Sequence, residues 1–226
     1  MKIIARIRTP YKEKFGIPRQ SGIADSIVSR IVFEPEYRRD EALVGISGYS
    51  HLWLIWNFSE AEREEFSPTV RPPRLGGNRR VGVFATRSPY RPNPIGLSSV
   101  RLVGTEKSEK EGTVLLVRGA DMLDGTPIYD IKPYLPFTDS HPDATGGFAE
   151  EVFDYCVKVD FPESLLSVIS EEYREPLIKI LSEDPRPSYK KGNEKEYGML
   201  FADWEIFFKE TDGVLTVTKV LGAAPK

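Results

Sequence analysis

Cysteine and histidine are scarce in this sequence. Its 226 residues include one cysteine, Cys156, and two histidines, His51 and His141, which lie far apart. A single cysteine excludes an internal disulfide, as is usual for proteins of a reducing compartment. So few Cys and His ligands argue against a structural zinc site, and we predict no metal at the functional site.

Long apolar runs are also missing. No stretch approaches the roughly 18 residues that a membrane-spanning helix needs. The N-terminal segment, residues 1–15, is too charged, and its apolar part too short, for a secretory signal peptide. We therefore expect a cytoplasmic protein that has no membrane partner.

Common nucleotide-binding and catalytic patterns are absent too. The sequence contains neither the phosphate-binding motif GxxxxGK[ST] nor the dinucleotide fingerprint GxGxxG. No Ser-His-Asp or Cys-His arrangement can be assembled from its few histidines. His51 lies in an apolar segment, SHLWLIWNF, where a buried, hydrogen-bonded histidine is the more common outcome.

The composition is that of a globular protein with unevenly distributed charge. Hydrophobic residues make up 40% and charged residues 29% of the chain, and the length predicts one large domain or one domain with a small companion. Residues 1–105 carry 17 Lys/Arg and 10 Asp/Glu, or +7, and residues 106–226 carry 14 and 24, or −10, which together give −3. A basic first half suggests an anionic partner, but attraction between the two halves explains the asymmetry equally well.

Residues 68–96, PTVRPPRLGGNRRVGVFATRSPYRPNPIG, hold six arginines, six prolines and no acidic residue. The prolines exclude a regular helix, and a strand is predicted at 81–87. Because guanidinium groups bind carboxylates and phosphates bidentately, this stretch predicts an anion-binding site. The alternative is a basic surface loop that forms salt bridges with the acidic remainder of the chain.

Short strand patterns dominate the first 133 residues. Strands are predicted at residues 2–8, 26–33, 50–58, 81–87, 96–106 and 112–119 and late in 121–133, with a short helix at 37–44. Six or seven short strands with little helix between them are typical of a closed or nearly closed β-barrel.

Past about residue 145 the pattern changes. Helices are predicted at 161–170 and 175–183, with Pro176 in the first turn of the second helix. A hairpin is predicted from 204–208 and 214–221. We therefore predict a mainly β protein, with a β-barrel in residues 1–145 and a small α+β unit in residues 146–226.

Three polar loops lie at predicted strand ends, where ligand sites are common. They are PRQ at 18–20, SHL at 50–52 and LDGTP at 123–127. The Asp-Gly-Thr within the third loop is equally compatible with a simple β-turn.

Several motifs resemble those of the TsaA-like (TrmO) family over nearly the whole chain. They are TPYKEKFGIPRQ, YSHLW, the arginine-rich stretch continued to Ser98, DGTPIYDIKPYLPF and DPRPSYKKG. The resemblance implies a small β-barrel in place of a Rossmann domain, a C-terminal α+β extension, a homodimer and S-adenosylmethionine as methyl donor. It implies N6-methylation of the threonylcarbamoyl-adenosine 3′ of the anticodon in threonine tRNA.

The resemblance also implies a set of donor-binding residues. These are Pro18, Arg19, Gln20, His51, Leu52, Arg87, Leu97, Leu123, Asp124, Gly125 and Thr126. In this set Asp124 is expected to accept hydrogen bonds from ribose or the amino group, and Arg19 or Arg87 to pair with the donor carboxylate. The three leucines are expected to sandwich the adenine.

Candidate catalytic residues follow the LDGTP loop. Asp130, Lys132 and Tyr134 alternate along a strand and therefore share one face, where one of them is expected to contact the acceptor. The alternative is that Asp130 and Lys132 only pair with each other. The predicted tRNA-binding residues are Arg71, Arg74, Arg79, Arg80, Arg91, Arg186, Lys190 and Lys191.

Two other functions stay open on the sequence. One is a module that binds the donor or RNA without catalysis, and the other is a Mg²⁺-dependent phosphoester hydrolase. Stabilisation by S-adenosylmethionine and S-adenosylhomocysteine, but not by Mg²⁺, supports the methyltransferase.

Overall fold

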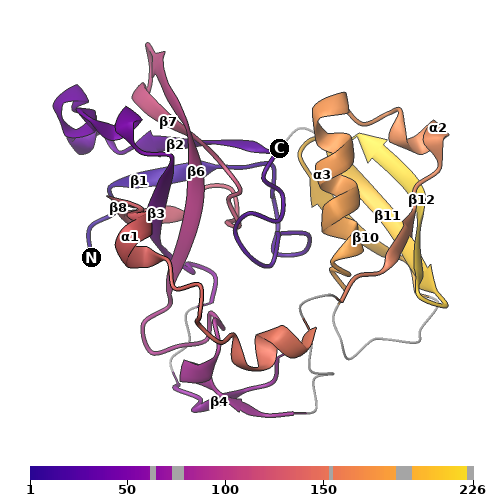
Figure 1. The fold of residues 1–226 in the computed structure, drawn as a ribbon. Coiled ribbons are helices and arrows are strands. Elements are labelled where there is room, and N and C mark those ends of the chain that lie inside the picture. Colours follow the sequence, from indigo (N-terminus) through magenta and orange to yellow (C-terminus); the bar gives the residue numbers. More distant parts are fainter. Residues whose placement is uncertain (62–64, 73–78, 153–154, 187–194, 223–226) are drawn as a thin grey trace.

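Six strands form a closed barrel in the first part of the chain (Figure 1). The computed structural model describes all residues except 62–64, 73–78, 153–154, 187–194 and 223–226. The barrel strands are β1 (Ala5–Arg8), β2 (Val28–Phe33), β3 (His51–Asn57), β6 (Ile95–Ser108), β7 (Gly112–Arg118) and β8 (Pro127–Pro133). Their order is β1-β2-β7-β6-β3-β8, and all six pairings are antiparallel.

Burial alternates strictly along β3, which shows how a strand of the barrel faces the interior. In β3, Leu52, Leu54 and Trp56 are buried, and the residues between them are only partly buried. A period of two places alternate side chains on one face of a strand. These three side chains pack with Ile7 of β1 and Ile31 of β2 in one apolar cluster. The core face of β3 is therefore readable from its sequence.

The arginine-rich stretch departs from its predicted strand. A two-stranded sheet joins β4 (Thr69–Val70) to β5 (Val81–Gly82), and a 3-10 turn, η5 (Val83–Ala85), follows. The predicted strand at 81–87 is therefore wrong beyond Gly82. The carbonyl of Val83 accepts from the backbone and the hydroxyl of Thr86, which closes the turn and ends the pairing.

The predicted helix at 37–44 is replaced by three 3-10 turns. They are η1 (Pro35–Tyr37), η2 (Asp40–Leu43) and η3 (Ile46–Gly48). Arg39 has an extended backbone between the first two, and Gly45 has φ 85° between the second and third. These two breaks keep the turns too short to propagate an α-helix.

The C-terminal part of the chain is a four-stranded sheet with helices. It contains β9 (Lys158–Asp160), α2 (Glu163–Leu166), α3 (Glu171–Ser182), β10 (Tyr197–Phe201), β11 (Trp204–Thr211) and β12 (Val214–Gly222). Before it come α1 (Pro136–Asp139), whose Asp139 accepts a hydrogen bond from Trp53 of β3, and η6 (Gly147–Val152). The sheet order is β10-β11-β12-β9. The predicted β11–β12 hairpin is confirmed, with positive φ at Asp212 and Gly213 in its turn. Strands β9 and β10 were not expected from the sequence.

Both predicted helices need correction. The first spans only Glu163–Leu166, because the guanidinium of Arg174 binds the carbonyls of Ser167 and Ile169 in the following turns. The second begins at Glu171, so Pro176 lies inside it and not in its first turn. Burial of Pro176 together with Leu177, Ile180 and Leu181 offsets the unfavourable interior proline.

The loop between β1 and β2 belongs to the core of the C-terminal sheet. Tyr11, Ala24 and Ile27 are buried in the apolar cluster of that sheet. The backbone N–H of Ala202 donates to the carbonyl of Pro10 at 2.8 Å, and that of Leu200 donates to Glu13. The loop that carries Pro18–Gln20 is therefore held between the barrel and the C-terminal sheet.

No helix among the described residues has the length and apolarity required to cross a membrane.

Candidate functional site

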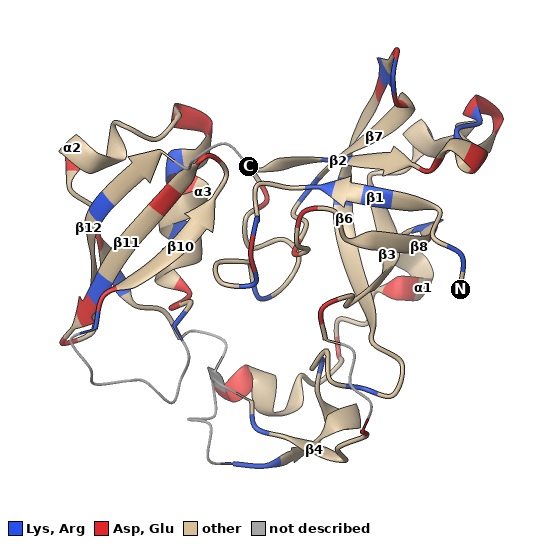
Figure 2. Cartoon of the chain, turned by 180° about the vertical axis from the view of Figure 1, so that it is seen from behind, with Lys and Arg blue, Asp and Glu red and all other residues tan. Residues whose placement is uncertain are grey.

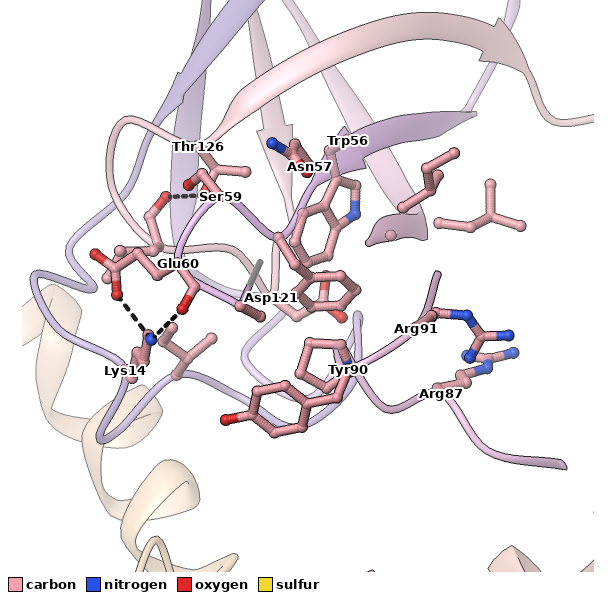
Figure 3. A pocket seen from close by; sticks show the side chains of 18 of the residues that line it. Lys14, Trp56, Asn57, Ser59, Glu60, Arg87, Tyr90, Arg91, Asp121 and Thr126 are labelled. Carbon is pink, nitrogen blue, oxygen red and sulfur yellow. Dashed lines mark hydrogen bonds and ion pairs between the residues drawn. The ribbon is translucent and has the colours of Figure 1, made fainter. Parts of the chain in front are cut away.

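A cavity of about 560 Å³ opens where five segments meet at the barrel. Its wall is formed by some of the residues in each of the segments 14–20, 56–61, 86–91, 95–97 and 121–126. Figure 3 shows Arg87 and Arg91 together on one side and the ion pair of Lys14 and Glu60 on the other. We call this space the first cavity; its size is that of an ordinary small-molecule site.

A hydrogen-bonded chain crosses the wall of the first cavity. The indole Nε1 of Trp56 donates to Ser98 Oγ at 3.0 Å, and Ser98 Oγ donates to Asp121 Oδ1 at 2.6 Å. Strand pairing of β3 with β6 brings the indole to Ser98, and Asp121 enters from the loop before β8. This chain fixes the orientations of the indole and the carboxylate in the cavity wall.

Asp121 has an unusual environment for a carboxyl group. Burial raises its pKa above the ordinary value, and the hydrogen bond from Ser98 and the charge of Arg87 only partly oppose this. The sequence analysis did not single it out. The sequence feature that points to Asp121 is an acidic residue after a strand, between two apolar neighbours, Ala120 and Met122, which are both buried.

Gly96 makes room for Trp56. A Cβ at Gly96 would lie 2.2 to 2.6 Å from three atoms of the indole, which no real contact allows. The two residues are direct partners in the β3–β6 pairing. The glycine in NPIG therefore permits the indole to lie flat over β6 at the cavity.

Seven of the eleven predicted donor-binding residues line the first cavity. They are Pro18, Arg19, Gln20, Arg87, Leu97, Leu123 and Thr126. Arg87 Nη1 donates to Gln20 Oε1 at 2.7 Å, which joins the arginine-rich stretch to the PRQ loop. Arg19 Nη2 donates to the carbonyl of Asp184 at 2.6 Å, which joins the same loop to the segment after α3.

His51 and Leu52 do not line the cavity. They begin β3, whereas Trp56 and Asn57, at its other end, are the residues in the wall; five residues of strand span roughly 16 Å. Leu52 is 1% exposed in the barrel core, so the prediction that it sandwiches the adenine is wrong in this structure. His51 is half-buried beside Ser50 Oγ, 2.9 Å from its Nδ1, so the expectation of a fully buried histidine is also wrong.

Asp124 and Gly125 also lie outside the cavity wall. The carboxylate of Asp124 accepts from the backbone N–H of Thr9 at 3.0 Å and pairs with Lys12 at 3.0 Å. The carbonyl of Gly125 accepts from Arg6, and Gly125 has φ 80°. These contacts match the turn alternative for this loop, and only Leu123 and Thr126 turn toward the cavity.

The predicted catalytic residues lie on the barrel exterior. Lys132 Nζ forms an ion pair with Asp130 at 2.9 Å, which agrees with the alternative that these two residues only pair with each other. The ring of Tyr134 packs on Trp53 at 5.5 Å and His51 at 6.2 Å, and none of the three predicted residues lines either cavity described here. Among the described residues, no three His, Cys, Asp or Glu side chains gather as a possible metal site.

A second cavity of about 1110 Å³ adjoins the first. It lies over the β4–β5 sheet, and Figure 2 shows basic residues on the β4 unit. Both cavities share Arg19, Gln20 and the segment 86–90 in their walls. The described residues that line the second cavity include four arginines, Arg19, Arg71, Arg80 and Arg87, and no acidic residue.

The predicted tRNA-binding residues separate into groups. Arg71 and Arg80 line the second cavity, and Arg79 pairs with Glu151 at 3.5 Å. Arg91 lines the first cavity but donates to the carbonyls of Thr86 at 2.7 Å and Val83 at 3.5 Å, so its guanidinium stabilises the turn. Arg74, Lys190 and Lys191 lie outside the described residues.

Arg186 is not an RNA-facing residue. It is 5% exposed and pairs with Asp184, at 2.7 Å for the shorter contact, and with Glu210. The prediction that it binds phosphates is therefore wrong, because its donors are buried against two carboxylates. Arg186 holds the segment after α3 onto β11.

Curated relatives match this chain closely over most of its length. The tRNA (adenine(37)-N6)-methyltransferase of Escherichia coli K12 is 41% identical over 217 residues, which cover 92% of each chain. The enzyme of the same name from Eikenella corrodens is 43% identical over 175 residues, covering 76% of this chain and 97% of that one. A protein of Pyrococcus abyssi, named "Probable S-adenosyl-L-methionine-binding protein", is 40% identical over 148 residues, 66% of this chain and 74% of that one.

Solved structures agree with this relationship. A crystal structure of TrmO from Pseudomonas aeruginosa superposes with a TM-score of 0.74 at 33% identity and covers 97% of both chains. A second TrmO crystal structure gives a TM-score of 0.76 at 32% identity. The model of the tRNA-methyltransferase O N-terminal domain matches residues 6–140, and that of the TrmO C-terminal domain matches residues 155–223. The chain therefore belongs to the tRNA-methyltransferase O family.

Proposed function

We propose that this chain is an S-adenosylmethionine-dependent tRNA methyltransferase that methylates N6 of the threonylcarbamoyl-adenosine 3′ of the anticodon in threonine tRNA. The names of the E. coli and E. corrodens relatives support adenine-N6 methylation of tRNA. The observation that carries the proposal is the pair of adjoining cavities with a shared wall, one of ligand size and one basic.

The residues of the first cavity fit the parts of the donor. Trp56, Leu97 and Leu123 offer apolar and aromatic surface for the adenine. Arg87 offers a guanidinium for the carboxylate of the methionine moiety. Asp121 offers a carboxylate for its ammonium group or for the ribose hydroxyls.

The residues of the second cavity fit the acceptor. Anticodon-loop phosphates and the carboxylate of a threonylcarbamoyl group are anionic, and Arg71 and Arg80 supply cations there. These two arginines are better candidates for that carboxylate than Arg91, whose guanidinium already binds two backbone carbonyls.

Catalysis in this arrangement depends mainly on alignment. S-adenosylmethionine supplies, when bound, an activated methyl group for in-line displacement. The segment 86–90, shared by both cavities, positions the two sites side by side. Arg91 donates to the carbonyl of Thr86, and the hydroxyl of Thr86 donates to the carbonyl of Val83, so this segment is rigid where the two cavities meet.

Three finer features are part of the proposal. A homodimer in solution rests on the family resemblance. A cytoplasmic location and a division into a barrel unit, residues 1–145, and a C-terminal unit, residues 146–226, rest on the sequence patterns. Sedimentation of the purified chain tests the first, and separate expression of the two units tests the third.

The proposal is tested on purified threonine tRNA with and without the threonylcarbamoyl group. We expect methylation, measured by mass spectrometry of nucleosides, only of the modified tRNA and only with S-adenosylmethionine present. Equal methylation of both tRNAs would contradict the need for the threonylcarbamoyl group. Methylation of a different tRNA in its place would contradict the threonine specificity.

A further inference from the structure

Two large aromatic side chains lie exposed beside the second cavity. Phe84 is 73% exposed and Phe66 is 54% exposed. Their rings stack at a centroid distance of 6.2 Å with an interplanar angle of 25°. Exposed apolar groups gathered in pairs, in contrast to scattered single residues, mark a binding surface.

The local fold directs the side chain of Phe84 toward solvent. In η5 the neighbouring Val83 is 1% exposed and anchors the turn inside the protein. Its backbone N–H donates to the carbonyl of Pro68, and its carbonyl accepts from Thr86. With Val83 and Thr86 fixed, the side chain of Phe84 is directed outward and lines the second cavity.

Arginines lie beside Phe84. The guanidinium carbon of Arg91 lies 5.9 Å from the centroid of the Phe84 ring. Arg71 and Arg80 line the same cavity as Phe84. Aromatic rings bordered by arginines are the arrangement by which proteins hold unpaired nucleotides, since the rings stack on bases and the cations contact phosphates.

We propose that Phe84 and Phe66 stack on an unpaired base of the tRNA anticodon loop, with Arg71 and Arg80 contacting its backbone. The inference rests on the proposed function in one respect, namely that the partner is tRNA. The lining of the second cavity favours RNA over a second copy of the chain, because guanidinium groups bind the phosphates that every RNA loop carries, and four arginines but no acidic residue line this cavity among the described residues. Phe84 is two residues from Thr86, which lines both cavities, so a base stacked there lies next to the wall that they share.

The test compares Phe84→Leu and Phe66→Leu with Phe84→Tyr and with Phe137→Leu in the full-length protein. Phe137, in α1, is 87% exposed and lines neither cavity, so it is a matched control. Affinity is measured by fluorescence anisotropy with a labelled threonine tRNA anticodon stem-loop. We expect Phe84→Leu to weaken binding about 10-fold or more, Phe66→Leu to weaken it less, and Phe84→Tyr and Phe137→Leu to leave it nearly unchanged.

Salt dependence and donor binding distinguish a loss of stacking from a loss of phosphate contacts or of the donor site. Loss of stacking should leave the slope of log K against log salt unchanged. Arg80→Gln should remove one phosphate contact and so reduce the magnitude of the slope by about one. Affinity for S-adenosylhomocysteine, measured by calorimetry, should not change in any Phe variant. Unchanged tRNA affinity in both Leu variants overturns the inference. Dissociation of an oligomer by Phe84→Leu, seen in sedimentation, also overturns it and assigns the pair to a contact between copies.

The outcomes separate this inference from the proposed function. If the wild type binds the stem-loop through Phe84 but does not methylate threonine tRNA, only the proposed function fails. If the wild type methylates threonine tRNA and Phe84→Leu has no effect on binding, only the stacking inference fails.

Discussion

At the scale of single residues, the carboxyl group of Asp121 is buried at an energetic cost that its neighbours offset only in part. Ser98 and Arg87 favour its charged form, yet burial raises its pKa overall. Such a group is common where binding or catalysis requires a charge in a closed site. Stability and function should therefore respond in opposite directions to its neutralisation.

Asp121→Asn should stabilise the protein at neutral pH and weaken donor binding. A carboxyl group with a raised folded pKa contributes stability below its unfolded pKa, about 4, and that contribution is lost as pH rises through the raised value. The melting temperature of the variant should exceed that of the wild type at neutral pH, and the difference should disappear in acid. Calorimetry should show a loss of donor binding of roughly 1.5–3 kcal/mol, typical of a charged hydrogen bond.

The control for Asp121 is Asp130→Asn. Asp130 carries an exposed carboxylate, pairs with Lys132 and lines neither cavity. Little change is expected in its melting temperature or donor affinity. Unchanged donor affinity in Asp121→Asn would remove that residue from the donor site.

Gly96→Ala should destabilise the barrel and disturb Trp56. The added Cβ would lie within 2.6 Å of the indole, so the ring must shift and the hydrogen bond to Ser98 is strained. Overpacking of this kind costs about 1–3 kcal/mol. Urea unfolding followed by tryptophan fluorescence measures it, and Gly82→Ala, where nothing lies within 4 Å of the new Cβ, is the control. Equal unfolding curves for the two variants would contradict this account of Gly96.

At the scale of elements, the loop from Thr9 to Gln20 connects all parts of the site. It packs on β10 through Tyr11 and Glu13, and its Arg19 binds the segment after α3. Arg186 in turn fixes that segment to β11 through Asp184 and Glu210. The C-terminal sheet therefore supports the donor cavity indirectly, by holding the PRQ loop in place.

Arg186→Gln should destabilise the protein without a specific loss of tRNA affinity. Removal of the guanidinium leaves the carboxylates of Asp184 and Glu210 without the cation that neutralises them, which typically costs about 3–5 kcal/mol when such a pair is buried. Arg79→Gln, in an exposed pair with Glu151, should cost less than about 1 kcal/mol. Chemical denaturation measures both. If Arg186→Gln keeps its stability and instead loses tRNA affinity, the residue is a phosphate contact after all.

At the scale of the whole molecule, tRNA affinity should depend more on the local charge of the second cavity than on the net charge of the chain. The chain has a net charge of −3, yet the second cavity is lined by four arginines and no acidic residue among the residues described. We expect tRNA affinity to fall steeply with salt, because released counterions and not net charge govern the slope. Binding isotherms at several salt concentrations measure this, and a flat plot of log K against log salt would assign the arginines to the fold or to the donor.

Much of the fold could be predicted from local patterns. The alternation in β3, the β6–β7 hairpin and the β11–β12 hairpin each depend on neighbouring residues, and all three are observed. Strand β9 has three residues and pairs in parallel with β12, so it leaves too little local pattern to detect. The interior position of Pro176 contradicts its local preference, because tertiary burial of the α3 face prevails.

The candidate site could be predicted only in part. Arg87 and Gln20 were expected in one site on motif resemblance, and they are hydrogen-bonded in the structure. Asp124 and Leu52 belong to the same motifs, but their side chains turn to Thr9 and to the barrel core. A motif indicates which segments approach the site, and the backbone direction at each residue decides which side chains enter it.

The sequence by itself determined the strand periodicities, the absence of an α-helix in the described part of the proline- and arginine-rich stretch, and the family to which the chain belongs. The tertiary structure alone decided that Trp56, Ser98 and Asp121 form one chain of hydrogen bonds and that Arg186 is buried. The physical reason is the separation in sequence over which each interaction acts. Periodicity and turn chemistry act between neighbours in sequence, whereas closure of the barrel sets contacts between residues 23 and 42 positions apart, and no local pattern encodes their register.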